Sequence, residues 1–142
     1  MNGCGGETGS DGRLALAGAC LIAVLLFQGC AAEVQRTPTS FTSLPSGDPE
    51  AIVTVLKDVE ITPALGYTRT IRTGSQWRLV GGTAQGDVYR PVSGVFTVEG
   101  AQVHEAGLVI SGVKLVGFYM LVEKAFVPLG SPVELQLSRG AR

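Results

Sequence analysis

Apolar side chains recur at every second position of this chain from about Ala51 onward. In the first such stretch four apolar residues fall on one face: Val53, Val55, Val59 and Ile61. A period of two is typical of a half-buried β-strand, whereas a helix repeats every 3.6 residues. No ten-residue segment after position 50 shows helical periodicity. The pattern therefore predicts an all-β fold.

Further strands are predicted between glycine-containing turns: Tyr67–Thr73, Gln76–Gly81, Asp87–Val92, Val95–Glu99, Gln102–Ser111, Lys114–Glu123 and Val133–Leu137. This spacing favours a small antiparallel sandwich or barrel of about seven or eight strands. Gly112, between two apolar arms, predicts the clearest hairpin, and Gly81-Gly82 predicts a second turn. The segment from Lys114 is apolar on both faces, with Leu115 and Tyr119 on one side. We expect it to be a buried central strand, the alternative being an outer face that docks onto a partner or a membrane.

A second feature is an uncharged apolar run of fourteen residues, Leu14 to Phe27, which follows Arg13. A membrane-spanning helix needs roughly 20 apolar residues, so the run is typical of the hydrophobic region of a signal peptide. The uncharged stretch continues to Ala32, and an uncleaved anchor is the alternative.

The run ends in Leu26-Phe27-Gln28-Gly29-Cys30-Ala31-Ala32. Here the chain resembles a bacterial lipoprotein precursor, over about its first 32 residues and through Gly29 directly before Cys30. The resemblance implies cleavage before Cys30, diacylglycerol on its sulfur and acylation of the freed amine. Ala31, where an Asp would imply retention in the inner membrane, implies transfer to the outer membrane, facing the periplasm. Ordinary cleavage after Ala32, releasing a soluble periplasmic protein, is the alternative.

The cysteines agree with this interpretation. Cys4, Cys20 and Cys30 all lie in the first 30 residues, so the rest of the chain can form neither a disulfide nor a thiolate metal site. Lipidation also explains a lone cysteine at the new N-terminus.

The sequence divides into four parts: a signal peptide (1–29), a lipidated N-terminus with a flexible tether (30–50), a β domain (51–138) and a tail (139–142). The tether is rich in Thr, Ser and Pro, and Pro38, Pro45 and Pro49 favour extended, solvated backbone. Fully extended, its eighteen residues from Glu33 to Glu50 would span at most about 60 Å.

The balance of acidic and basic residues gives no indication of a highly charged partner. From Cys30 to the C-terminus there are ten acidic and ten basic residues, without a polybasic run, so nucleic acid is not expected as a partner. His104 is the single histidine, and its neighbour Glu105 would point to the opposite face of a strand, which argues against a catalytic dyad. We expect a surface or edge histidine, with a general base or a single metal ligand as the alternative.

Sequence motifs give little sign of catalysis after Cys30. The chain has no G-x-S-x-G motif there, and the glycine-rich stretch Gly81–Gly86 lacks the Lys-Ser/Thr ending of a phosphate loop. We therefore expect a protein that is not an enzyme, with no catalytic residue, no metal site and no cofactor.

One cluster predicts a binding edge: Trp77, Arg78, Asp87, Tyr89 and Arg90. If Gly81–Gly86 forms a hairpin loop, Arg78, Tyr89 and Arg90 meet across two strands, and the aromatic rings offer flat faces. In the alternative, Trp77 belongs to the core and the arginines pair with Asp87 and Glu99.

The sequence thus predicts a membrane-anchored envelope lipoprotein whose β domain is a binding or assembly module. Its expected partners are the membrane, through the lipid, and an envelope protein or cell-wall component. The alternative is a soluble periplasmic β domain that binds a small ligand inside a barrel.

Overall fold

The computed structural model describes residues 36–45, 52–63, 67–100 and 102–139, in which β-strands joined by turns and loops are the only regular elements. The predicted all-β class is confirmed. Every strand pair is antiparallel. The strands are β1 (Thr37–Pro38), β2 (Thr42–Ser43), β3 (Ile52–Val55), β4 (Val59–Ile61), β5 (Arg69–Ile71), β6 (Gln76–Thr83), β7 (Gly86–Pro91), β8 (Thr97–Glu99), β9 (Val103–Ser111), β10 (Lys114–Met120), β11 (Ala125–Glu134) and β12 (Leu137–Arg139).

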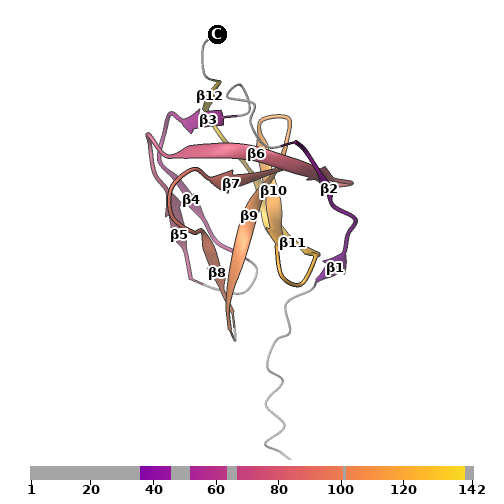
Figure 1. Cartoon of the computed structure of the whole chain (residues 1–142). Helices are drawn as coiled ribbons and strands as arrows, with labels where there is room; N and C mark the ends of the chain where they lie inside the picture. The colour runs from indigo at the N-terminus through magenta and orange to yellow at the C-terminus, as the bar shows by residue number, and fades with distance from the viewer. Residues whose placement is uncertain (1–35, 46–51, 64–66, 101, 140–142) are drawn as a thin grey trace, which may run out of the picture. The chain divides into compact units, whose positions relative to one another are not determined.

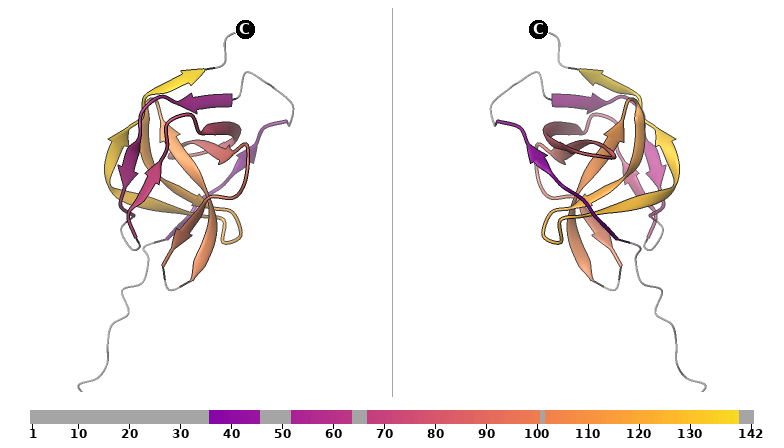
Figure 2. Two further views of the ribbon diagram at one scale, coloured as in Figure 1. Left: turned by 90° about the vertical axis from the view of Figure 1, so that its left-hand side faces the viewer. Right: turned by 90° about the vertical axis from the view of Figure 1, so that its right-hand side faces the viewer.

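Ten strands belong to one sheet. Its order is β1-β11-β10-β9-β7-β6-β3-β12, with β2 beside β6 and β8 beside β9, while β4 and β5 form a separate two-stranded sheet. Strands β6 and β7 cross β9, β10 and β11 at a steep angle, and the large sheet bends round its own inner face (Figures 1 and 2). The arrangement is sandwich-like, and the bend encloses the main core.

Most of the buried apolar side chains line this inner face. The most deeply buried members of the main core include Val55, Ile61, Leu108, Leu115, Phe118, Met120 and Leu135. The first predicted strand does place Val53, Val55 and Ile61 in this core, but it is divided into β3 and β4 at Leu56–Asp58. The division lets β3 pair with β6 and β12, while β4 pairs with β5.

The hairpin predicted at Gly112 is confirmed. Ser111 pairs with Lys114, and Gly112 has a φ of 65°, which a residue with a side chain rarely adopts. The second turn is not at Gly81-Gly82, because both glycines lie inside β6. The chain instead turns at residues 84–85, between the paired residues Thr83 and Gly86.

Strand β10 is central, between β9 and β11, as predicted, but the assignment of its faces is wrong at one end. The register shifts between Leu115 and Gly117, and this bulge adds one residue to the alternation. Leu115 therefore joins Phe118 in the main core, whereas Val116 joins Tyr119 on the outer face.

The structure differs from the expected flexible tether at residues 36–45, which we call the N-terminal strap. Thr37 pairs with Phe126 of β11, and Thr42 pairs with Gly82 of β6. The amide of Leu44 also donates to the carbonyl of Val80 at 2.9 Å. The strap crosses the outside of the bent sheet from β11 to β6 (Figure 2).

The strap pairs with the sheet because the outer face beneath it is apolar. A second cluster of buried side chains lies there, made of Val88, Val109, Tyr119 and Phe126. The ring of Phe41, in the middle of the strap, stacks on Tyr119 with 5.0 Å between ring centroids and 18° between ring planes. The packed part of the chain thus includes residues before the expected boundary at 51.

The expected C-terminal boundary also differs by one residue, because Arg139 belongs to β12 and pairs with Val53. The signal-peptide prediction and Cys30 lie outside the described residues.

Candidate functional site

The predicted binding edge lies on the β6–β7 hairpin, and the hairpin does bring its members together. Arg78 is directly opposite Arg90, and Leu79 is opposite Tyr89. Both arginines and Asp87 are exposed. The positive side chains of the edge are therefore gathered on the outer surface, as the sequence predicts.

The two aromatic residues of the edge do not offer flat faces to a ligand. Trp77 is buried, its Nε1 donates to Ser75 Oγ at 3.0 Å, and its ring packs edge-on against Phe96 at 5.5 Å between centroids. Tyr89 is also part of the main core, where burial and the nearby charge of Asp87 raise the pKa of its phenol. The structure thus agrees with the alternative in which Trp77 belongs to the core.

The partners of the arginines are not the predicted ones. Arg90 Nη2 pairs with Glu105 Oε1 of β9, and Glu99 pairs with Arg69 instead. Arg78 forms no ion pair with any residue that the structure describes. Because the Arg90–Glu105 pair is well exposed, its contribution to stability is small.

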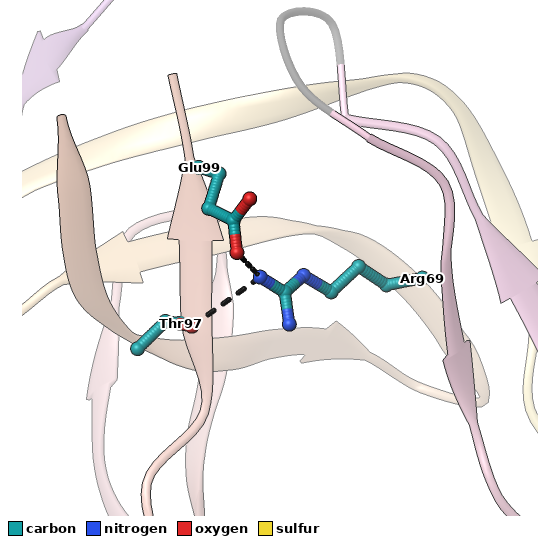
Figure 3. Close-up of polar contacts among 3 residues, drawn as sticks. All are labelled: Arg69, Thr97 and Glu99. Atoms are coloured by element: carbon teal, nitrogen blue, oxygen red, sulfur yellow. Dashed lines mark hydrogen bonds and ion pairs between the residues drawn. The ribbon is translucent and has the colours of Figure 1, made fainter. Parts of the chain in front are cut away.

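A polar contact joins the small sheet to the large one. Arg69 of β5 reaches across to β8, where its Nη2 pairs with Glu99 Oε1 and donates to Thr97 Oγ1 at 3.4 Å (Figure 3). Both side chains of the ion pair are about a third exposed, so the contact chiefly orients the β4–β5 hairpin.

The single histidine lies in β9 and its side chain is paired and mostly covered, which corrects the surface half of the expectation of a surface or edge histidine. The side chain of His104 is only 10% exposed, and its Nδ1 contacts Glu123 Oε1 in the turn between β10 and β11. Glu105 points elsewhere, to Arg90, so the two neighbours do not share a proton. Glu123 Oε2 is buried without a hydrogen-bond partner among the described residues. Sequence reasoning missed this contact because Glu123 is nineteen positions away.

One end of the β unit, which we call the β1 end, brings together the start of β1, the β8–β9 hairpin and the β10–β11 turn (Figure 1). Two contacts fix this arrangement besides the pairing of His104. The amide of Thr39 donates to the carbonyl of Lys124 at 3.4 Å, and the amide of Leu121 donates to that of Glu105 at 3.2 Å. The first described residue, Arg36, directly precedes β1.

Three of the most exposed large apolar side chains belong to the β1 end. They are Val122 of the β10–β11 turn (80% exposed), Tyr67 before β5 (77%) and Val103 at the start of β9 (66%). Val103 is paired with Glu99, whose partner Arg69 follows Tyr67 by two residues. Val122 and Tyr67 thus come from loops, and Val103 comes from the first residue of a strand.

Among the residues described by the structure, no group of three or more His, Cys, Asp and Glu side chains is arranged to hold a metal ion. In the same residues no helix has the length and hydropathy needed to cross a membrane.

Comparison of the chain with protein-family models, with curated proteins and with solved structures gives no match.

Proposed function

We propose that this protein is a lipid-anchored lipoprotein of the bacterial envelope, with a small β domain that serves as a non-catalytic binding or assembly module. The observation that carries the proposal is Gly29-Cys30 at the end of a fourteen-residue apolar run, with no cysteine in the remaining 112 residues. Such a leader and a single modified cysteine would direct the protein to the periplasmic side of the outer membrane.

Lipidation of Cys30 would make a durable anchor. Each methylene buried in the bilayer contributes about 0.8 kcal/mol, and one acyl chain alone binds only marginally, whereas an N-terminus with several chains stays bound.

The domain offers a binding surface rather than a reactive centre. The partly exposed His104 is paired with Glu123, and Arg90 is paired with Glu105. The exposed Arg78 on the predicted edge, now without an aromatic partner at the surface, is the side chain that we propose contacts an acidic group of an envelope protein or of the cell wall.

The test is metabolic labelling of growing cells with an alkyne-bearing fatty acid, followed by detection on the purified protein. We expect label on the wild type and on the matched control Cys20→Ala, and none on Cys30→Ala. Globomycin, which blocks the lipoprotein signal peptidase, should cause the unprocessed form to accumulate. Equal labelling of Cys30→Ala and the wild type would refute lipidation at Cys30, and no label on either would refute the proposal and favour the soluble periplasmic alternative.

A further inference from the structure

We infer that the β1 end of the domain rests on the lipid bilayer, with Val122, Val103 and Tyr67 in contact with the membrane interface. The inference depends on the proposed lipidation of Cys30. It goes beyond it, because a lipid anchor alone leaves the orientation of the domain open.

The first step is the length of chain between the anchor and the packed domain. Since the N-terminal strap pairs with β11 and β6, the domain begins at about Arg36 rather than near position 51. Only five residues, 31–35, separate Cys30 from Arg36. However they are arranged, they cannot place Arg36 more than about 20 Å from the lipidated cysteine.

The domain is wider than the distance that these five residues can span. A domain of about 100 residues has a radius of gyration of about 13 Å, so its diameter exceeds the available reach. The polar headgroup layer on one side of a bilayer occupies several ångströms of that reach as well. The domain cannot move clear of the surface, and the part that includes Arg36 must stay next to it.

The third step is the chemistry of that part. The strap leaves Arg36 beside the β10–β11 turn, because Thr37 pairs with Phe126 and the amide of Thr39 donates to Lys124. Val122 in this turn is 80% exposed, and the side chain of Lys124 is exposed as well. Apolar side chains, tyrosine rings and lysines with long aliphatic stems are the residues that partition into the headgroup region.

A lipid surface suits these side chains better than a protein partner does. Val122 and Tyr67 project from two separate loops and Val103 from the start of β9, so they do not form the continuous packed patch that a protein interface needs. A fluid interface accepts separate side chains without a matching shape.

The test uses the lipidated protein in vesicles of phosphatidylethanolamine and phosphatidylglycerol that contain a nitroxide-labelled lipid as quencher. The thiol of Cys30 is blocked by lipid and the mature chain has no other cysteine, so a single new cysteine can be labelled specifically with an environment-sensitive fluorophore. Val122→Cys is the test position, and Val103→Cys is a second one. Val113→Cys is the matched control, since Val113 is also an exposed valine in a hairpin turn, at the other end of β10.

We expect the lipid nitroxide to quench the fluorophore at positions 122 and 103 several-fold more than at 113. Equal quenching at 122 and 113, or none at either, in vesicles that carry the protein would overturn the inference. Shielding of position 122 from a water-soluble quencher without quenching by the lipid would also overturn it and would indicate a protein partner. Failure of the protein to float with the vesicles would instead refute the lipid anchor, so the two failures are distinguishable.

Discussion

Two glycines mark the points where aromatic rings cover the sheet. Gly81 and Gly117 each follow a residue at which the register shifts, Val80 in β6 and Val116 in β10. A Cβ atom at Gly81 would lie 2.5 Å from Phe41 Cζ, and one at Gly117 would lie 2.6 Å from Phe126 Cε2. Both glycines are thus required by close packing, since a ring occupies the space of the missing side chain.

A single carboxylate gives stability that depends on pH. Asp58 Oδ1 accepts hydrogen bonds from the amide and the hydroxyl of Thr73, both at 2.7 Å. These bonds, chiefly that from the hydroxyl, lower the pKa of Asp58, with a smaller contribution from the charge of Arg72. They close the segment between β3 and β4 against the turn that follows β5.

We predict that Asp58→Asn lowers the Tm at neutral pH and that this difference disappears in acid. A pKa that is lower in the folded state than in the unfolded state stabilises the protein above the unfolded value, and the gain is lost as the pH falls through the folded value. Thermal unfolding of both proteins between about pH 7 and about pH 2 measures the effect.

Glu60→Gln is the control for this prediction, because Glu60 is an exposed carboxylate nearby with no side-chain hydrogen bond or ion pair to a described residue. It should leave the pH dependence of Tm unchanged. A Tm difference for Asp58→Asn that is the same at every pH would show that the hydrogen bonds to Thr73 do not depend on ionisation.

At the level of elements, the N-terminal strap decides how the outer face of the sheet is covered. The buried cluster of Val88, Val109, Tyr119 and Phe126 would otherwise be an apolar patch on the outside of four strands. Phe41 contributes the stacked ring, and the backbone of the strap contributes pairing to β11 and β6. The strap therefore covers an apolar surface that would otherwise be exposed and prone to association.

Phe41→Ala should destabilise the domain by about 1–2 kcal/mol, because Phe41 is partly exposed and loses both burial and a stacked partner. For a domain of this size the Tm should fall by roughly 5–10 °C. Hydrogen exchange of the Leu44 amide, which donates to Val80, should accelerate in the variant, while the β9–β10 hairpin stays protected.

Ser40→Ala, an exposed neighbour in the same strap, is the matched control and should not change the Tm. Gly81→Ala should also weaken the packing of the strap, since its methyl group would meet the carbonyl oxygen of Thr42 as well as the ring of Phe41. Rapid exchange of the Leu44 amide already in the wild type, together with an unchanged Tm in Phe41→Ala, would contradict the packing of the strap.

Local patterns predicted the elements well where alternation was strong and glycine marked the turn. The β9–β10 hairpin at Gly112 and the central position of β10 followed from the residues alone. The strap could not be predicted in the same way, because proline and threonine dominate it and its pairing depends on a distant apolar face. One signal was present, since Phe41 is the single aromatic residue between Glu33 and Glu50.

The candidate site was predicted only in part, for two physical reasons. The β6–β7 hairpin does bring Arg78 and Arg90 together, which the positions of the turn residues suggested. The burial of Trp77 and Tyr89 depends on the bend of the whole sheet, and the bulge at Val80 changes which residues face inward. The partner of His104 likewise comes from a turn whose position is set by long-range pairing.

For the whole molecule, the distance between the proposed anchor and the domain decides how far the domain can move from the membrane. An eighteen-residue tether would reach about 60 Å and leave the domain free above the membrane. With residues 36–45 packed on the domain, only five residues separate Cys30 from Arg36, so the proposed lipid anchor at Cys30 would hold the domain at the surface. Partner binding would then involve surfaces away from the β1 end, among them the outer face with Arg78.

The proposed anchoring of the protein depends first on the chemical state of Cys30. Intact-mass spectrometry of the mature protein, purified from envelopes without reduction or hydrolysis, examines it directly. We predict a chain that starts at Cys30 and carries the added mass of a diacylglycerol group and an amide-linked acyl chain. A chain with a free thiol at Cys30, one that starts at Glu33, or one that keeps its leader would contradict the account.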